Sequence, residues 1–163
     1  MRHVYLDTNM LVAYFATGKK AEADRKKEIL KAFKVLLELA DVKLSLSMWT
    51  VTEMVQILIN QKGMGRKKVA EIANNLLREI KMEGLEIKIV SVSPRDGYTF
   101  DDFFYDVREK MILYNPGWGD AIHGVIMRNN GIKEILTFDG KDDFKIMPGL
   151  TVIHPKDVAV EPV

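Results

Sequence analysis

The sequence predicts a three-layer α/β/α domain with a central parallel sheet. Short apolar runs typical of strands alternate along the chain with longer segments whose apolar residues recur at helical spacing. Parallel strands need crossover connections, which are usually helices, so this alternation favours a parallel sheet covered on both faces. The length of 163 residues and the 47% hydrophobic content suit a single domain over residues 1–163.

Five strand-like runs divide the chain. They are short, rich in Val, Ile and Leu, and bounded by polar or turn-forming residues. The runs are Val4 to Leu6, Val42 to Leu46, Leu85 to Val90, Glu134 to Thr137 and Leu150 to Ile153. We expect these runs to form the central sheet.

Helix-like segments fill the intervals between these runs. Apolar residues recur on one face from Ala21 to Ala40, and the segment that begins SMWTVTE is apolar nearly all round. After two glycines, a further helix should extend from Arg66 to Met82 and end at Gly84. These last two helices are expected to form a hairpin.

Turn and capping residues delimit the later helices. Thr99 with Asp102 is a capping pair typical of a helix start, with Asp in place of the usual Glu. The stretch NPGWG, which contains Pro116 and Gly119, indicates a loop. That loop should lead into a helix from Ala121 to Asn130.

Charge and cysteine content limit the classes of protein. The 24 basic and 23 acidic residues give a net charge of +1, which favours neither a nucleic-acid coat protein nor an acidic tail. The absence of cysteine excludes disulfides, zinc ribbons and thiol nucleophiles, and it fits a reducing cytoplasm. No apolar stretch approaches the roughly 20 residues that cross a bilayer, and no signal-like leader precedes the first strand. We therefore expect a cytoplasmic protein without membrane association.

Four acidic residues fall at places where an open α/β sheet collects functional groups. Asp7 and Asp139 each follow a strand-like run, at the carboxyl edge where such sheets bind ligands. Glu53 lies on a narrow polar stripe of an apolar helix, and Asp120 lies at the start of another helix. Structural roles are the alternative. Asp7 and Asp120 can stabilise helix starts, Glu53 can face solvent, and Asp139 can belong to a turn.

Further polar residues accompany these acids. His123 lies one turn beyond Asp120 on the same helix face, so it can join an acidic site. We favour a hydrogen-bonded helix histidine as its role. Asp142 and Asp143 lie in the same loop as Asp139, and we rank them below it.

Convergence of the acids would require a cation. Two carboxylates about 4 Å apart repel by roughly 4 kcal/mol at an effective dielectric constant of 20, so a cluster needs a metal ion or shared protons. A site made only of oxygen ligands favours Mg²⁺ or Mn²⁺.

The segments YLDTN, TE, GDAIH and LTFD, in that order, resemble the four acidic motifs of the PIN-domain nucleases. The pattern extends over essentially the whole chain. Among these nucleases, the sequence is most similar to the short, single-domain VapC-type ribonuclease toxins. The resemblance implies a sheet with strand order 3-2-1-4-5, an acidic pocket at its carboxyl edge, and cleavage of RNA with Mg²⁺ or Mn²⁺.

The resemblance also assigns residues to the site. The four acidic positions, as catalytic residues and metal ligands, are Asp7, Glu53, Asp120 and Asp139, and the flanking polar positions are Asn9 and Thr137. Family members commonly place an Asp-Phe pair one residue after the fourth acid, whereas here three residues separate Asp139 from Asp143. Either Asp139 or Asp142 can therefore complete the metal site, and Asp142 and Asp143 are candidate supporting residues.

The chemistry expected of such a site needs no side-chain nucleophile. One or two cations would bind the scissile phosphate, lower the pKa of a water molecule and stabilise the leaving oxygen. Without the four acids the chain has 24 basic and 19 acidic residues, so the rest of the surface can attract RNA. The candidate phosphate contacts are Lys19, Lys20, Arg25, Lys26, Lys27, Arg66, Lys67 and Lys68. A solvated basic face is the alternative for these residues.

The resemblance implies two protein partners, a second copy of the chain in a homodimer and a small antitoxin. Two other functions stay open: a housekeeping PIN nuclease in RNA processing, and a metal-free interaction module in which the acids are helix caps. The haloacid-dehalogenase and receiver classes are disfavoured. The former would need a second aspartate where Asn9 stands, and the latter would need paired acids there.

Overall fold

A computed structural model describes residues 2–16, 20–39, 41–79, 81–82, 85–92, 95–140, 144 and 148–158. Within these ranges, six strands form one sheet. They are β1 (Arg2–Leu6), β2 (Val42–Ser47), β3 (Lys81–Met82), β4 (Leu85–Val90), β5 (Glu134–Leu136) and β6 (Thr151–Ile153). The sheet order is β3-β4-β2-β1-β5-β6.

The central parallel sheet confirms the predicted fold class. β1 pairs in parallel with β2 and β5, β2 with β4, and β5 with β6. When β3 is set aside, this arrangement is the 3-2-1-4-5 order that the resemblance implied. β1 therefore lies in the middle of the sheet, and the chain that follows it emerges at the carboxyl edge.

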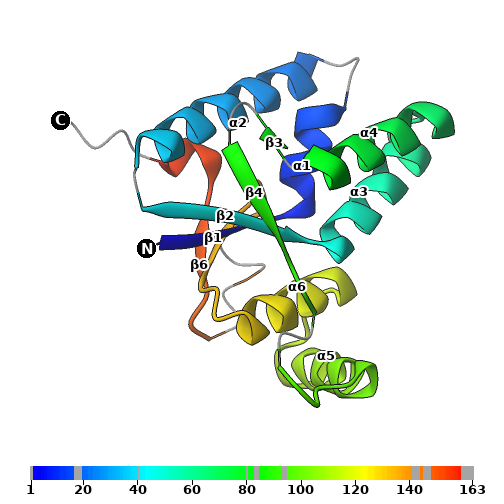
Figure 1. Ribbon diagram of the computed structural model, residues 1–163, viewed down its shortest axis with the longest axis vertical. Coiled ribbons are helices and arrows are strands. Elements are labelled where there is room, and N and C mark those ends of the chain that lie inside the picture. Colours follow the sequence, from blue (N-terminus) through cyan, green and yellow to red (C-terminus); the bar gives the residue numbers. More distant parts are fainter. Residues whose placement is uncertain are drawn as a thin grey trace.

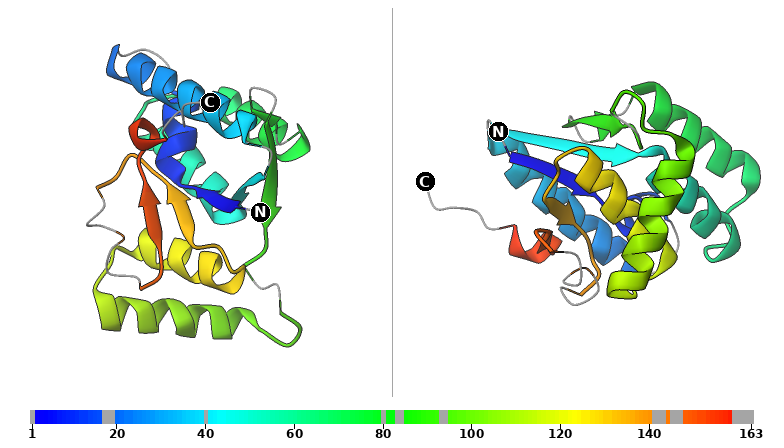
Figure 2. Two further views of the ribbon diagram at one scale, coloured as in Figure 1. Left: turned by 90° about the vertical axis from the view of Figure 1, so that its left-hand side faces the viewer. Right: turned by 90° about the horizontal axis from the view of Figure 1, so that it is seen from below.

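Helices cover both faces of the sheet, as expected (Figure 1). On one face lie α1 (Thr8–Phe15), α2 (Lys20–Glu38), α3 (Met48–Asn60) and α4 (Arg66–Glu79). On the other lie α5 (Phe100–Tyr114) and α6 (Trp118–Asn129). Figure 2 shows that α5 packs along α6 on the side away from the sheet. A short 3₁₀ helix, η1 (Pro155–Asp157), follows β6.

Alternation along β1 divides the core into two parts. Val4 and Leu6 point toward α1 to α4, whereas Tyr5 between them points toward α5 and α6. This is the period-two pattern of a strand that is buried on both faces. Tyr5 is fully buried, so its hydroxyl must find partners inside the protein.

Two predicted boundaries are wrong. The helix predicted to extend from Arg66 to Met82 ends at Glu79, because Lys81 and Met82 pair antiparallel with the start of β4. The loop predicted to contain Gly119 is shorter, because α6 already begins at Trp118 with Gly117 as its N-cap. Asp120 therefore lies within the first turn of α6, as the helix-dipole argument requires.

None of the helices in the described ranges is long and apolar enough to cross a membrane. The longest of them, α2, is strongly charged.

A candidate acidic site at the carboxyl edge of the sheet

Asp7 lies at the junction of β1 and α1, where each of its two carboxylate oxygens accepts a hydrogen bond. It is the N-cap of α1, and its Oδ1 accepts a 2.6 Å hydrogen bond from the backbone N–H of Thr8. The hydroxyl of Thr137 donates to Oδ2 at 2.6 Å. With 5% of its surface exposed, Asp7 is a buried carboxylate whose orientation is fixed by its neighbours.

Thr137 joins Asp7 to the loop after β5. Its hydroxyl oxygen accepts hydrogen bonds from the Asn9 amide at 2.8 Å and from the Asp139 backbone N–H at 3.0 Å. Asn9 in turn accepts a 3.1 Å hydrogen bond from the backbone N–H of Phe138. Hydrogen bonds of Asn9 and Thr137 therefore connect α1 to the start of the loop that contains Asp139. Asp139 itself is exposed.

Glu53 reaches the same edge from α3. Its Oε2 accepts a 2.6 Å hydrogen bond from the Thr8 hydroxyl and lies 2.8 Å from Nε2 of His123. Burial alone would raise the pKa of this carboxyl, but the contacts with His123 and Thr8 outweigh burial and lower the pKa. Glu53 is thus held in its charged form, with 21% of its side chain exposed.

His123 lies at the centre of these acids. Its Nε2 is 3.7 Å from Oδ1 of Asp7, besides the contact with Glu53. Burial opposes a charge on the imidazole, but the hydrogen bond to Glu53 and the charges of Asp7, Glu53 and Asp120 raise its pKa. Three of the four predicted acids therefore act on one buried side chain.

The start of α6 approaches Glu53 closely because it has no side chain at Gly119. A Cβ at that position would lie 2.6 Å from Oε1 of Glu53. At Gly117, a Cβ would lie 3.3 Å from Oδ2 of Asp120. The absence of a side chain at Gly119 thus lets the backbone of α6 pack directly against the carboxylate of Glu53.

The sequence of residues 4–149 matches the family model described as PIN domain. The chain belongs to the PIN-domain family. No curated protein matches the sequence.

Solved PIN-domain structures have a similar fold. The structure of VapC20 from Mycobacterium tuberculosis, described as a sarcin-ricin-loop-cleaving toxin, is 16% identical, with a TM-score of 0.58. The match covers 90% of this chain and 96% of that one. VapBC2 from Rickettsia felis, solved bound to a DNA fragment from its promoter, is 12% identical, with a TM-score of 0.61. That match covers 93% of this chain and 98% of the other.

The structure brings some of the predicted site residues of this PIN domain together, whereas others lie outside the described residues. Asp7 and Glu53 contact His123, the charge of Asp120 acts on the same imidazole, and Asp139 is connected to Asp7 through Thr137. Asp142 and Asp143 lie outside the described residues, so the choice between Asp139 and Asp142 stays open. Within the described ranges, no three His, Asp or Glu side chains are grouped closely enough to hold a metal ion.

The donor chemistry nevertheless fits a divalent cation. Asp7, Glu53 and Asp120 offer carboxylate oxygens, the ligands that Mg²⁺ and Mn²⁺ prefer. Glu53 contacts Thr8 and His123 through Oε2, whereas Oε1 faces the backbone of α6 at Gly119.

The predicted basic contacts lie along α2 and α4. Those described as exposed are Lys20, Arg25, Lys27, Arg66, Lys67 and Lys68. The Arg25 guanidinium lies over the Phe138 ring at 5.4 Å, beside the loop that carries Asp139. Lys26 is partly buried, with its ammonium 4.6 Å from the centre of the Tyr14 ring. Lys19 lies outside the described residues.

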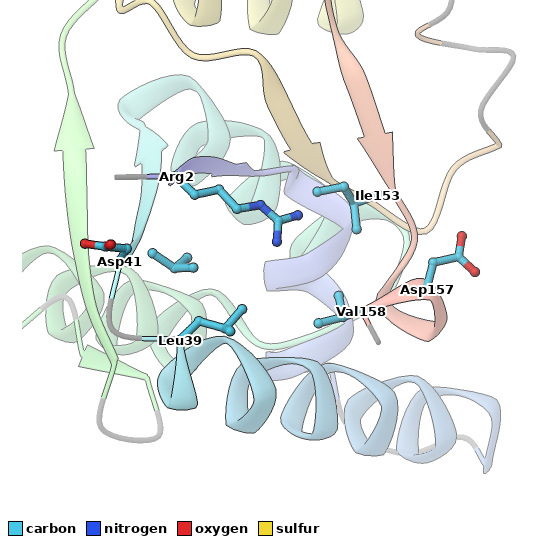
Figure 3. Close-up of a pocket in the computed structure, with 7 residues that line it drawn as sticks. Arg2, Leu39, Asp41, Ile153, Asp157 and Val158 are labelled. Carbon is cyan, nitrogen blue, oxygen red and sulfur yellow. The ribbon is translucent and has the colours of Figure 1, made fainter. Parts of the chain in front are cut away.

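Two hollows lie near the PIN-domain sheet. The first is bounded by the end of α2, the starts of β1 and β2, and η1 (Figure 3). It is lined by Arg2, Leu39, Asp41, Val42, Ile153, Asp157 and Val158, and by none of the proposed acids. The second is a groove between the starts of α3, α5 and α6, where Trp49, Phe104 and Trp118 present aromatic rings. None of the proposed acids lines this groove.

Sequence reasoning missed several polar residues of the site. Thr8 adjoins Asp7 in the sequence, but its hydrogen bond to Glu53 spans 45 positions. Ser47 and Thr50 form a capping box at the start of α3, and the signal available in the sequence was Ser47, a typical N-cap residue. For His123, the role we favoured was a hydrogen-bonded helix residue. It is hydrogen-bonded, and it also belongs to the acidic site.

Proposed function

We propose that this PIN domain is a metal-dependent endoribonuclease and the toxin of a toxin–antitoxin pair. The observation that carries the proposal is the contact of Asp7 and Glu53 with His123 at the carboxyl edge of the sheet, where the charge of Asp120 also acts on the imidazole. That edge is where open α/β sheets place their ligands. The fold similarity to VapC20 and VapBC2, whose descriptions name a cleaving toxin and a promoter-bound complex, supports the same proposal.

The acids would hold one or two Mg²⁺ or Mn²⁺ ions, with Asp139 or Asp142 as the fourth ligand. The bound cation would supply a Lewis acid for the phosphate and a water molecule of lowered pKa. The protein supplies the orientation of the carboxylates: Thr8 and Thr137 fix Asp7, and Thr8 and His123 fix Glu53. No side-chain nucleophile takes part.

Two surface features support RNA as the substrate. The basic residues of α2 and α4 can bind phosphates, and Arg25 lies beside the loop of Asp139. The aromatic groove, which Trp118 at the start of α6 helps to line, offers ring faces on which unpaired bases can stack. Trp118 is 46% exposed, and its ring is nearly parallel to that of Phe104, with an interplanar angle of 18°.

An RNA cleavage assay tests the proposal. The purified protein should cut a mixed RNA pool in Mg²⁺ or Mn²⁺, and EDTA should abolish the cutting. Asp120→Asn should lose most of the activity, since it removes a charge from the metal site. Asp101→Asn is the matched control, because Asp101 also lies in the first turn of a helix but on exposed α5. Cleavage that persists in EDTA, or equally in Asp120→Asn, would contradict the proposal.

The proposed antitoxin is a small protein whose peptide tail lies over the basic helices α2 and α4 and directs an Arg or Lys at the acids. Expression of the chain alone should then slow growth, and co-expression of the antitoxin should restore it. Normal growth with soluble, RNA-cleaving protein would favour the second candidate, a housekeeping nuclease with the same site chemistry.

We also propose that the protein is a homodimer. The outer side of α5 exposes Tyr105, Ile112 and Leu113, at 56%, 68% and 66% of their surfaces. Large apolar side chains exposed together mark interaction surfaces, and a two-fold dimer would cover the same patch on both copies. Light scattering should give twice the monomer mass of 18.6 kDa, and the monomer mass at micromolar concentration would contradict the dimer.

A further inference from the structure

A chain of buried hydrogen bonds connects the core of the sheet to Glu53. The Tyr5 hydroxyl lies 2.6 Å from the Ser47 hydroxyl, 2.8 Å from the Thr50 hydroxyl and 3.0 Å from Nδ1 of His123. On its other side, the His123 imidazole contacts Glu53 through Nε2. All four residues that lead to Glu53 are buried, with at most 1% of their surfaces exposed.

In this series of hydrogen bonds, the donor between His123 and Glu53 can be assigned. A charged Glu53 can only accept, so Nε2 of His123 must carry the hydrogen of that contact. The Tyr5 hydroxyl can either donate to Nδ1 or accept from it. The contact between Tyr5 and His123 therefore survives whether the imidazole is neutral or charged.

Besides the hydrogen bonds at its two nitrogens, the His123 imidazole makes a ring contact with Tyr5 that restrains its orientation. The rings of Tyr5 and His123 pack edge to face, with centroids 5.5 Å apart and an interplanar angle of 64°. The Tyr5 hydroxyl is itself held by Ser47 and Thr50, which form the capping box of α3. Since Glu53 is on α3, one helix supplies both the anchor of the chain and the acid at its end.

The geometry points to Tyr5 and His123 as positioning residues that set the orientation of the Glu53 carboxylate. His123 and Thr8 hold Oε2, so that Oε1 faces Gly119 and the first turn of α6. Among the described residues, Tyr5 forms no hydrogen bond with a proposed acid, so it acts through His123. This inference rests on the proposed function in one respect, that Glu53 is a metal ligand.

Hydrogen bonds that orient a metal ligand have a measurable effect. Their removal from metal sites commonly costs about 10- to 100-fold in metal affinity or activity. A purely structural role for Tyr5 predicts something different, a loss of thermal stability with an unchanged affinity for metal. Metal affinity therefore separates the two roles.

A double-mutant cycle on Mn²⁺ affinity tests the inference. Calorimetric titration would compare the wild type with Tyr5→Phe, His123→Leu and the double variant, each checked for its fold by circular dichroism. Tyr5→Phe should weaken Mn²⁺ binding about tenfold, and His123→Leu at least as much. The double variant should bind no more weakly than His123→Leu, because Tyr5 acts through His123.

Two further variants make the cycle decisive. Ser45→Ala is the matched control, because Ser45 is a buried β2 hydroxyl without a hydrogen-bond partner among the described residues. It should bind Mn²⁺ like the wild type. His123→Gln keeps a donor that can reach Glu53 and should recover part of the affinity, and it replaces His123→Leu in the cycle if the latter does not fold.

The outcomes distinguish the inference from the proposed function. If the wild type binds Mn²⁺ and Tyr5→Phe changes only the melting temperature, the positioning role is wrong and the metal site stands. Additive losses in the double variant would also overturn the inference. If the wild type binds no Mn²⁺, the metal site fails and the positioning role fails with it.

Discussion

At the residue scale, Asp7 shows that a helix cap and a proposed functional acid can be the same side chain. The sequence offered these roles as alternatives, because Asp7 both follows a strand and precedes a helix. In the structure, Oδ1 caps α1 through Thr8 while Oδ2 is fixed by Thr137 from β5's loop. The cap orients the carboxylate, so the two roles are compatible.

Other residue-level features could not be predicted from spacing. The hydrogen bond between Tyr5 and His123 joins positions 118 apart, and no local pattern encodes such a pairing. The alternation of β1 does predict that Tyr5 faces away from Val4 and Leu6. Which polar groups meet its hydroxyl depends on how α3 and α6 pack, and this is a property of the whole fold.

Gly119 gives the residue-scale prediction. In Gly119→Ala, the new Cβ would lie 2.6 Å from Oε1 of Glu53, so the carboxylate or α6 must shift. Alanine favours a helix by up to about 1 kcal/mol over glycine, so the variant should fold. Its Mn²⁺ affinity and RNA cleavage should nevertheless fall about tenfold or more.

A matched control is Gly65→Ala at the start of α4, where a Cβ meets no atom within 4 Å. It should leave metal binding and cleavage unchanged. Equal Mn²⁺ affinity in Gly119→Ala and Gly65→Ala would show that close packing against Glu53 is unimportant.

At the element scale, helix starts were predicted well where side-chain chemistry decides them. The capping pair Thr99 and Asp102 marks the start of α5, and both of its hydrogen bonds are present. The end of α4 was wrong because strand pairing at Lys81 and Met82 overrides local helix preference. The start of α6 was misplaced because Gly119 was interpreted as a loop residue.

The capping pair of α5 gives a prediction that depends on pH. Hydrogen bonds from the Thr99 backbone N–H and then from its hydroxyl lower the pKa of Asp102. A carboxyl with a lowered pKa stabilises the fold above its ordinary pKa of 3.8, and this stabilisation is lost as the pH falls through the lowered value. Thr99→Ala should destabilise the protein by about 1 kcal/mol near neutral pH, through loss of the N-cap.

Urea denaturation near pH 7 and near pH 3 checks this prediction. The difference between the wild type and Thr99→Ala should shrink at the lower pH, because the stabilisation from the Asp102 carboxylate begins to be lost below the ordinary pKa of 3.8. A difference that stays the same at both pH values would assign the effect to Thr99 alone. Asp101→Asn, one residue before Asp102, serves as the control.

At the scale of the whole molecule, the fold explains how acids far apart in the sequence reach one edge. Parallel strands end at the same edge, so an acid after β1 and a helix after β2 are brought together by topology alone. This part of the site could be predicted from the sequence. The contacts of Asp7 and Glu53 with a buried histidine could not, since they depend on how α6 packs against α3.

Charge is also separated over the molecule. The net charge is only +1, but proposed acids gather at the carboxyl edge while basic residues lie along α2 and α4. A nearly neutral protein can therefore combine a cation site with a surface that attracts phosphates.

Binding of Mn²⁺ tests the central claim, a metal site formed by these carboxylates, most directly. Calorimetric titration of Mn²⁺ into the EDTA-treated, dialysed wild type should show saturable binding, and Asp120→Asn should bind much more weakly. At a free-metal concentration a hundredfold above the dissociation constant, Mn²⁺ should stabilise the wild type by about 2.7 kcal/mol. Absence of binding to the wild type at millimolar Mn²⁺, or equal binding by Asp120→Asn, would contradict the claim.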